Sequence, residues 1–301
     1  MTPTGRFAPS PTGPLHLGSL VAAVGSWLFS RAENGRWLVR MEDLDAARVV
    51  PGSADEILRT LERHGLAWDG EVRYQSKQTG DYVSALDRLQ AEGRAYPCAC
   101  SRAEVARSSS APGPGDETEG PVYPGTCRTG TAGRAARAWR FRVEPGTTRF
   151  FDEVFGEVAE DVERRVGDFV LKRADGPFAY QLAVVVDDAA QQVTRIVRGA
   201  DLLPSSARQI QLRRQLGYPE VKHAHLPVVV GSDGRKLGKR DGALPLDGLD
   251  ERGIRRNLLL ALRALGHEAE GDPAEMLEQA RRAFDASTIP RGPLALSGLP
   301  G

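Results

Sequence analysis

The sequence lacks a net charge, a membrane-length apolar run and an internal repeat. Its Lys and Arg residues number 40, as do its Asp and Glu residues, so overall basicity does not mark a nucleic-acid partner. The polar, proline-containing N-terminus does not resemble a signal peptide, and we expect a cytoplasmic protein without membrane contact. Three arginine clusters are candidates either for phosphate-binding faces or for ordinary solvated ones: Arg134, Arg137, Arg140 and Arg142; Arg208, Arg213 and Arg214; Arg252, Arg255 and Arg256.

The composition that remains is typical of a globular protein with one large or two modest domains. Hydrophobic residues make up 41% of the 301 positions and charged residues 27%. A strand at 37–41 alternates with helices at 20–29, at 79–92 and from Ser53, which could cap its helix. This alternation favours an α/β fold with a parallel sheet.

The alternation breaks at Tyr96 and resumes after about Asp168. A cysteine pair, a Ser/Gly/Pro-rich stretch at 108–121 and an alternating segment at 139–143 predict a small, partly β insertion there. Strands are then expected at 169–172, 182–186 and 226–230, and helices at 206–216, 248–265 and 272–284, the last with an Asp272-Pro273 cap. We therefore expect a larger domain split into residues 1–95 and 169–240, an insertion at 96–168 and a helical region at 241–301.

The run from Arg6 to Ser19, Arg-Phe-Ala-Pro-Ser-Pro-Thr-Gly-Pro-Leu-His-Leu-Gly-Ser, is a loop that leads into the first expected helix. A helix N-terminus offers unpaired N–H groups and a positive dipole end, which suit phosphate. Gly18 allows a close approach of a flat ring, and His16 can hold charge on phosphate oxygens. For an isolated His-x-Gly, a turn with a core histidine would be the better interpretation.

The whole run resembles the first signature of class I aminoacyl-tRNA synthetases, in the form specific to the glutamate and glutamine branch. Lys236-Leu237-Gly238-Lys239-Arg240 resembles the second, lysine-rich signature, with Gly238 in place of the usual serine. The resemblance implies a Rossmann-like catalytic domain that uses ATP with Mg²⁺. It assigns catalysis to His16, Gly18, Lys236 and Lys239, and ATP binding to His16, Gly18, Ser19 and Lys239. The cations would stabilise negative charge during attack on the α-phosphate.

A pocket for glutamate needs one acidic partner for the ammonium and at least two basic partners for the carboxylates. Arg6 and Arg198 can supply guanidinium groups, Glu42 can take the ammonium, and Tyr180 can donate its hydroxyl. All four match glutamate-binding positions of the glutamyl-synthetase family, and Phe7, Ala8, Pro9 and Ser10 accompany Arg6 by the same resemblance. Which arginine takes which carboxylate stays open, as do a core role for Tyr180 and an Arg198–Asp201 ion pair. Glutamine is disfavoured, because it would leave a buried guanidinium without its carboxylate.

All three cysteines, Cys98, Cys100 and Cys127, lie in the expected insertion, which contains no histidine. A disulfide is not expected in the cytoplasm, so a structural zinc site is the favoured interpretation and three buried thiols the alternative. Spacing alone supplies no fourth ligand. By resemblance to the glutamyl-Q synthetases, Tyr123 fills that position.

After Arg240 the printed sequence has 61 residues (301 − 240), and the resemblance therefore extends to the truncated glutamyl-Q tRNA(Asp) synthetases, which lack an anticodon-binding domain. That family makes glutamyl-adenylate from L-glutamate and ATP without tRNA, and transfers glutamate to queuosine in the anticodon arm of tRNA(Asp). We expect a monomer. The alternatives are a truncated glutamyl-tRNA synthetase that charges tRNA(Glu), a nucleotidyltransferase without a tRNA role, and a non-catalytic tRNA-binding module.

Overall fold

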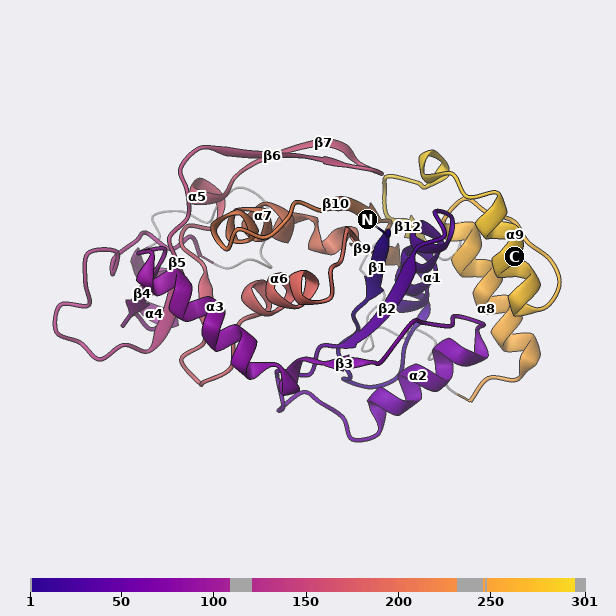
Figure 1. The fold of residues 1–301 in the computed structure, drawn as a ribbon, viewed down its shortest axis with the longest axis horizontal. Coiled ribbons are helices and arrows are strands. Elements are labelled where there is room, and N and C mark those ends of the chain that lie inside the picture. The colour runs from indigo at the N-terminus through magenta and orange to yellow at the C-terminus, as the bar shows by residue number, and fades with distance from the viewer. Residues whose placement is uncertain (1, 109–120, 232–245, 247, 296–301) are drawn as a thin grey trace.

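A central sheet, parallel except for the β6–β7 pair, organises the computed structural model, which describes residues 2–108, 121–231, 246 and 248–295 (Figure 1). Its strands belong to two hydrogen-bonded groups, β1-β2-β3 and β7-β6-β10-β9. The groups meet where the Thr194 N–H donates to the Thr4 carbonyl at 2.9 Å, just before β9. The strands are β1 (Thr4–Phe7), β2 (Arg36–Met41), β3 (Arg73–Tyr74), β6 (Thr147–Asp152), β7 (Gly156–Asp161), β9 (Arg195–Gly199) and β10 (Lys222–Leu226).

Helices surround this sheet, and the one that follows the first signature is central to the core. In α1 (Leu17–Arg31), the side chains of Leu20, Val24 and Leu28 are fully buried. A Cβ at Gly25 would lie 2.4 Å from a methyl carbon of Leu226, so glycine lets α1 approach β10 closely. The other main helices are α2 (Ser53–Arg63), α3 (Thr79–Ala91), α6 (Tyr180–Ala190), α7 (Ser206–Gln215), α8 (Glu251–Ala264) and α9 (Pro273–Arg282).

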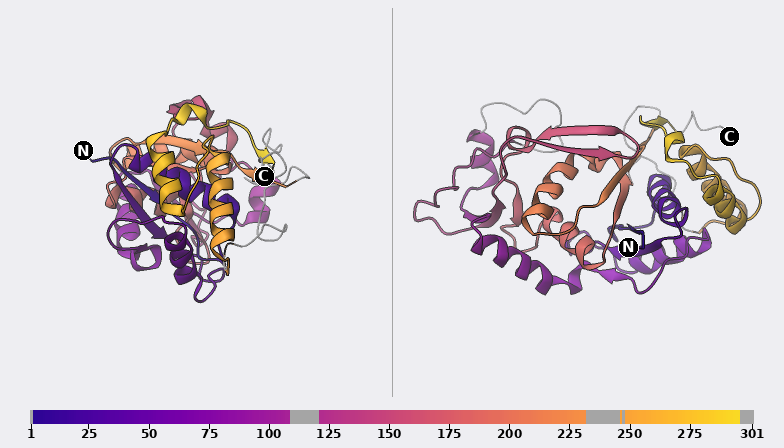
Figure 2. Two further views of the ribbon diagram at one scale, coloured as in Figure 1. Left: turned by 90° about the vertical axis from the view of Figure 1, so that its right-hand side faces the viewer. Right: turned by 45° about the horizontal axis from the view of Figure 1, so that its top comes forward.

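Short elements complete the larger part of the structure. They are the 3-10 turns η1 (Gln75–Lys77), η2 (Ala200–Ser205) and η3 (Ala286–Thr288), and the two-residue strands β11 (Val229–Val230) and β12 (Leu294–Ala295). The helices α8 and α9 pack side by side at the end of the molecule opposite β4 and β5 (Figures 1 and 2).

An antiparallel sheet of order β4-β5-β8 lies around the expected insertion, formed by β4 (Ala95–Cys98), β5 (Ala138–Phe141) and β8 (Val170–Lys172), the last of which follows the insertion. The insertion also carries α4 (Arg102–Ser108) and α5 (Val162–Arg165). The β6–β7 hairpin extends from this region along the molecule, and Asp152 pairs with His223 of β10 (Figure 1). The residue boundaries expected from the sequence therefore do not coincide with sheet boundaries.

Several local expectations were wrong. Residues 182–186 lie in α6 and do not form a strand, because a short continuous apolar run is also produced by a helix buried on all sides. The strand expected at 226–230 is divided into β10 and β11 around Pro227, which has no N–H to donate. Ser53 does not cap α2; its hydroxyl instead donates to the Gly13 carbonyl at 2.8 Å.

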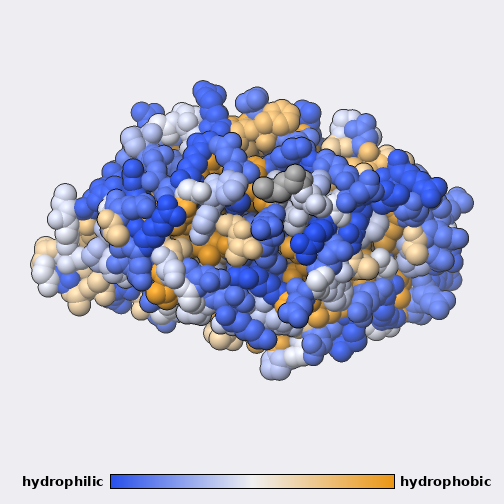
Figure 3. All heavy atoms as spheres, in the orientation of Figure 1, coloured by the Kyte–Doolittle hydropathy of each residue, from blue (hydrophilic) through white to orange (hydrophobic). Residues whose placement is uncertain are grey.

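Hydrophilic residues cover much of the face in Figure 3, with hydrophobic residues interspersed among them. In the described ranges, the exposed large hydrophobic side chains are Val50, Val83 and Phe151. None of the described helices has the length and apolar character that crossing a membrane requires.

Candidate active site

The first signature forms a loop fixed at several points before it enters α1. The Gly13 N–H donates to Ser53 Oγ at 2.9 Å, and the Glu42 N–H donates to the Pro9 carbonyl at 2.9 Å. His16 is the N-cap of α1, where its Nδ1 accepts from the Ser19 N–H at 3.2 Å. A Cβ at Gly18 would lie 3.2 Å from two atoms of the His16 ring, so the glycine allows this ring to lie against the helix start.

Arg198 occupies β9 near its carboxyl end and is 6% exposed. Its partners are all neutral groups. Nε donates to His225 Nε2 at 3.1 Å, Nη1 to Tyr180 Oη at 3.1 Å and to Gln209 Oε1 at 2.8 Å, and Nη2 to Ser206 Oγ at 2.9 Å. Among the described residues no carboxylate forms an ion pair with Arg198, so the alternative pairing with Asp201 is not observed there.

The neutral surroundings leave Arg198 and Tyr180 able to bind an anion together. Four of the five guanidinium N–H groups are used, and one Nη2 hydrogen remains. Because Tyr180 Oη accepts from Arg198, its own proton is available to a further acceptor. The remaining Nη2 hydrogen of Arg198 and the hydroxyl proton of Tyr180 can therefore both be donated to one carboxylate.

Arg6 has a different environment, dominated by Asp188. Its Nε and Nη2 donate to the two Asp188 carboxylate oxygens at 2.9 and 3.3 Å, and Nη1 donates to the Val197 carbonyl at 3.2 Å. Arg40 donates to the same carboxylate at 2.7 Å. Burial acts to raise the pKa of Asp188, but the two guanidiniums hold this pKa well below its usual value.

Glu42 lies beside this ion-pair network. Its Oε1 accepts from Arg40 Nη2 at 3.3 Å, and its side chain is 11% exposed. Burial raises the pKa of Glu42, against the opposing charges of Arg40 and Arg6. The structure thus places Glu42 near Arg6, while Arg6 contacts Val197, which precedes Arg198 in β9. Arg6 lies in β1, Glu42 directly follows β2, Arg198 lies in β9 and Tyr180 begins α6. Arg6 is near Glu42, and Arg198 donates to Tyr180.

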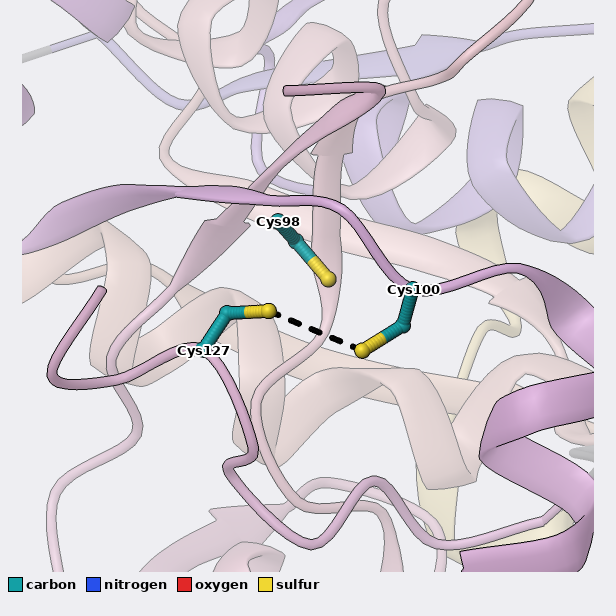
Figure 4. Close-up of side chains that lie close together, drawn as sticks. All are labelled: Cys98, Cys100 and Cys127. Atoms are coloured by element: carbon teal, nitrogen blue, oxygen red, sulfur yellow. Dashed lines mark hydrogen bonds between the residues drawn. The ribbon is translucent and has the colours of Figure 1, made fainter. Parts of the chain in front are cut away.

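The three cysteines converge in the insertion (Figure 4). Their Sγ atoms all lie within 4.8 Å of one another, and none is in a disulfide. Tyr123 Oη lies 3.4 Å from Cys98 Sγ and 3.9 Å from Cys100 Sγ. Sulfurs at tetrahedral positions around zinc lie about 3.8 Å apart, so the three thiol groups can hold a metal ion.

The arginine clusters have mixed environments. Arg134 pairs with Glu104, and the Arg140 guanidinium lies 3.7 Å from the centroid of the Tyr123 ring, so the first cluster mainly packs the insertion. Arg213 is buried and Arg214 pairs with Glu220. Arg252, Arg255 and Arg256 are exposed together on α8. Lys236, Gly238 and Lys239 lie outside the described residues.

Comparison with known proteins decides the family. The model for the catalytic domain of class I tRNA synthetases (E and Q) matches residues 4–285. The chain is 54% identical over 298 residues to the glutamyl-Q tRNA(Asp) synthetase of Dechloromonas aromatica, covering 97% of each chain. It is also 54% identical to that of Geobacter sulfurreducens, covering 95% of this chain and 93% of the relative. The chain belongs to the glutamyl-Q tRNA(Asp) synthetase family. It is a ligase of the aminoacyl-tRNA synthetase type.

Solved structures agree with this family in fold. The glutamate-tRNA synthetase of Elizabethkingia anophelis superimposes with a TM-score of 0.80 at 23% identity, over 98% of this chain and 68% of that chain. The glutamate tRNA ligase of Elizabethkingia meningosepticum, in complex with its amino acid, gives 0.81 at 23% identity, over 99% and 68%. The class I synthetase fold, with its parallel sheet, is therefore confirmed.

Residues that the sequence analysis did not identify surround the expected ones. Asp188 and Arg40 hold Arg6, while Ser206, Gln209 and His225 hold Arg198. These contacts are long-range; Arg6 and Asp188 are 182 positions apart. The one signal in the sequence that pointed to any of these residues is the pair of adjacent aspartates, Asp187 and Asp188, at the end of the apolar run in α6.

Proposed function

We propose that this synthetase activates L-glutamate with ATP to glutamyl-adenylate in the absence of tRNA. It then transfers glutamate to queuosine in the anticodon of tRNA(Asp). A carboxylate oxygen of glutamate attacks the α-phosphate of ATP and expels pyrophosphate. A hydroxyl of the queuosine cyclopentene ring then attacks the activated carbonyl carbon, and AMP leaves.

The observation that carries the glutamate assignment is the buried Arg198 guanidinium, whose hydrogen-bond partners in the described part of the chain are all neutral. A buried cation without a carboxylate partner favours an anionic ligand. With Tyr180 it would bind one carboxylate, and Arg6, held by Asp188, would contribute its remaining N–H groups to the other. Glu42 would receive the ammonium. Phe7, Ala8, Pro9 and Ser10 would form the adjoining loop wall.

ATP binding is assigned to the start of α1 and to the lysine-rich segment. His16 and Ser19 lie at the helix N-terminus, where backbone N–H groups and the helix dipole favour phosphate. Gly18 keeps the His16 ring close to the backbone. Lys236 and Lys239 are proposed to stabilise the phosphate charge that develops as pyrophosphate leaves. Mg²⁺ would accompany ATP.

Structural zinc is the metal proposed for the cysteine cluster, with Cys98, Cys100, Tyr123 and Cys127 as ligands. The Tyr123 hydroxyl contacts two of the sulfurs and accepts the Cys127 N–H at 2.9 Å, which supports its place as the fourth ligand. Four protein ligands leave no open position, so the ion would stabilise the insertion without taking part in catalysis.

The acceptor is proposed from the names of the relatives. We propose that a monomer in the cytoplasm receives the anticodon arm of tRNA(Asp). The division into residues 1–95, 96–168, 169–240 and 241–301 remains part of this proposal.

Two measurements test the proposal. Glutamate-dependent exchange of pyrophosphate into ATP should proceed without tRNA. Radiolabelled glutamate should then enter purified queuosine-containing tRNA(Asp), and no label should enter tRNA(Glu) or tRNA(Asp) that lacks queuosine. Label in tRNA(Glu) alone would instead identify a truncated glutamyl-tRNA synthetase, and absence of any glutamate-dependent exchange would point to another nucleotidyltransferase.

A further inference from the structure

An aspartate–histidine pair contacts Arg198 from within the protein. Asp152, at the end of β6, and His225, in β10, both have fully buried side chains. His225 Nδ1 lies 2.6 Å from Asp152 Oδ2, and His225 Nε2 lies 3.1 Å from Arg198 Nε. A continuous chain of hydrogen bonds therefore connects the β6–β7 hairpin to the guanidinium.

The proton positions in this chain follow from the chemistry of its ends. Arg198 Nε always carries a hydrogen, so His225 Nε2 must accept and cannot be protonated. The ring proton is then on Nδ1, which donates to the Asp152 carboxylate. Ser206 Oγ lies 3.3 Å from the same Nε2 and accepts from Arg198 Nη2 at 2.9 Å, so its hydroxyl proton can also point to His225.

Asp152 is itself held firmly. Its Oδ1 accepts the backbone N–H groups of Val154, Phe155 and His225 at 3.0, 2.9 and 3.2 Å. This leaves Oδ2 directed to the imidazole. Burial acts to raise the pKa of Asp152, but the hydrogen bonds from His225 and the backbone lower it, so the group is a carboxylate at neutral pH.

We propose that Asp152 and His225 are positioning residues for glutamate, which set the orientation of the Arg198 guanidinium through the tautomer of His225. The inference rests on the proposed function, in which Arg198 binds a glutamate carboxylate. The negative charge of Asp152 acts through a neutral ring, so Arg198 is oriented without a direct carboxylate partner. Arg6, by contrast, is paired directly with Asp188.

Asp152→Asn is the sharpest test of this chain. Asparagine keeps an oxygen for the three backbone N–H groups, but its amide donor then faces His225 Nδ1. The ring responds by moving its proton to Nε2, where it opposes the Nε–H of Arg198. In glutamate-dependent pyrophosphate exchange, we expect the KM for glutamate to rise at least about tenfold. The KM for ATP and kcat should change less than about twofold.

Two further variants separate this mechanism from a general loss of structure. Glu157→Gln makes the same charge change at an exposed position of the same hairpin and should leave all three parameters unchanged. His225→Gln replaces the ring by an amide whose oxygen can face Arg198 Nε whatever occupies position 152. In that background, Asp152→Asn should change the glutamate KM less than about threefold.

The outcomes are distinct. An inactive wild-type protein would contradict the proposed function. An active wild type with an unchanged glutamate KM in Asp152→Asn, or an equal effect with and without His225→Gln, would overturn the positioning role. Should Asp152→Asn fail to fold, ¹⁵N NMR of the wild-type ring decides: the Nδ1–H tautomer of His225 is expected, and the Nε2–H tautomer would overturn the proposal.

Discussion

Two buried arginines, Arg6 and Arg198, differ in what neutralises their charge. Arg6 lies against the Asp188 carboxylate, which Arg40 also contacts. Removing one partner from such a pair leaves an uncompensated buried charge, at a cost of about 3–5 kcal/mol, so Arg6 is fixed by structure whether or not glutamate is present. Among the described residues Arg198 donates hydrogen bonds only to neutral groups, and a bound carboxylate would supply a full countercharge.

Replacement of this guanidinium tests its assignment. Arg198→Ala should lower kcat/KM for glutamate in pyrophosphate exchange by a factor of at least about 100, because charge-assisted hydrogen bonds to a carboxylate are lost. Circular dichroism should show an unchanged fold. Arg214→Ala, at an exposed position of α7, is the control and should retain normal exchange. Normal exchange by Arg198→Ala would remove Arg198 from the pocket.

The residues proposed to bind glutamate were identified from the sequence only where a family motif contains them. Arg6, Glu42, Tyr180 and Arg198 stand in segments that match the family. Gln209 and His225 stand in no such motif. Their role depends on which side chain they contact in the folded protein, and the sequence alone does not give that contact. Nothing in the spacing of Arg198 and His225, 27 positions apart, distinguishes them from neighbouring buried residues.

At the scale of elements, turn and cap chemistry was more predictable than the identity of short apolar runs. Asp272-Pro273 marks the start of α9, and the structure has the capping box in which Asp272 accepts from the Glu275 N–H and Glu275 accepts from the Asp272 N–H. Residues 182–186 were interpreted as a strand because an apolar run of this length fits either a buried strand or a buried helix. Only the tertiary packing distinguishes the helix from a strand, because α6 is packed against α3 and α7.

The cap of α9 makes a quantitative prediction. Asp272→Ala removes one hydrogen bond to the helix start and a negative charge near its positive end, so the free energy of unfolding should fall by about 1 kcal/mol. Urea unfolding followed by circular dichroism measures the change. Asp272→Asn keeps the acceptor and should lose much less. An equal loss in both variants would show that the cap is not responsible.

The cysteine cluster predicts the metal content of the protein. Purified wild type should hold about one zinc per chain by mass spectrometry, and Cys100→Ser should lose most of it, because serine does not supply a thiolate ligand. Tyr123→Phe removes the proposed fourth ligand and should increase zinc release to a chelator. Tyr74→Phe, at a half-buried position of β3, should not. A metal-free wild type would favour three buried thiols.

At the scale of the whole molecule, buried charges connect segments far apart in the sequence. Asp188 of α6 binds Arg6 of β1 and Arg40 of β2, and Asp152 binds His225. These contacts join the first strands, α6 and the β6–β7 hairpin around one site. The alternation of strands and helices predicted the class of fold, but a balance of 40 positive and 40 negative charges gave no sign of which would be buried together.

Buried histidines should make the stability of the whole molecule depend on pH. His223 is 4% exposed, and its Nδ1 has no hydrogen-bond partner in the structure. Burial, followed by the positive charge of Arg198, lowers the pKa of His223 to about 3 from its usual 6.5. The folded protein therefore keeps the ring neutral where the unfolded chain binds a proton.

The direction of the effect follows from this difference. The contribution of His223 to stability is fully present above pH 6.5 and is lost as the pH falls from 6.5 toward 3. Below about pH 6, one such proton lowers the free energy of unfolding by up to about 1.4 kcal/mol per pH unit.

His223→Leu removes the titrating group at similar volume. Urea unfolding at pH 7.5 and pH 5 should show a smaller loss of stability on acidification in the variant than in the wild type. His64 and His267 lie on other elements, remain in both proteins and cancel in the comparison. An equal loss would mean that His223 can be protonated in the folded protein, and the interior around β10 would then have to admit a charge beside Arg198.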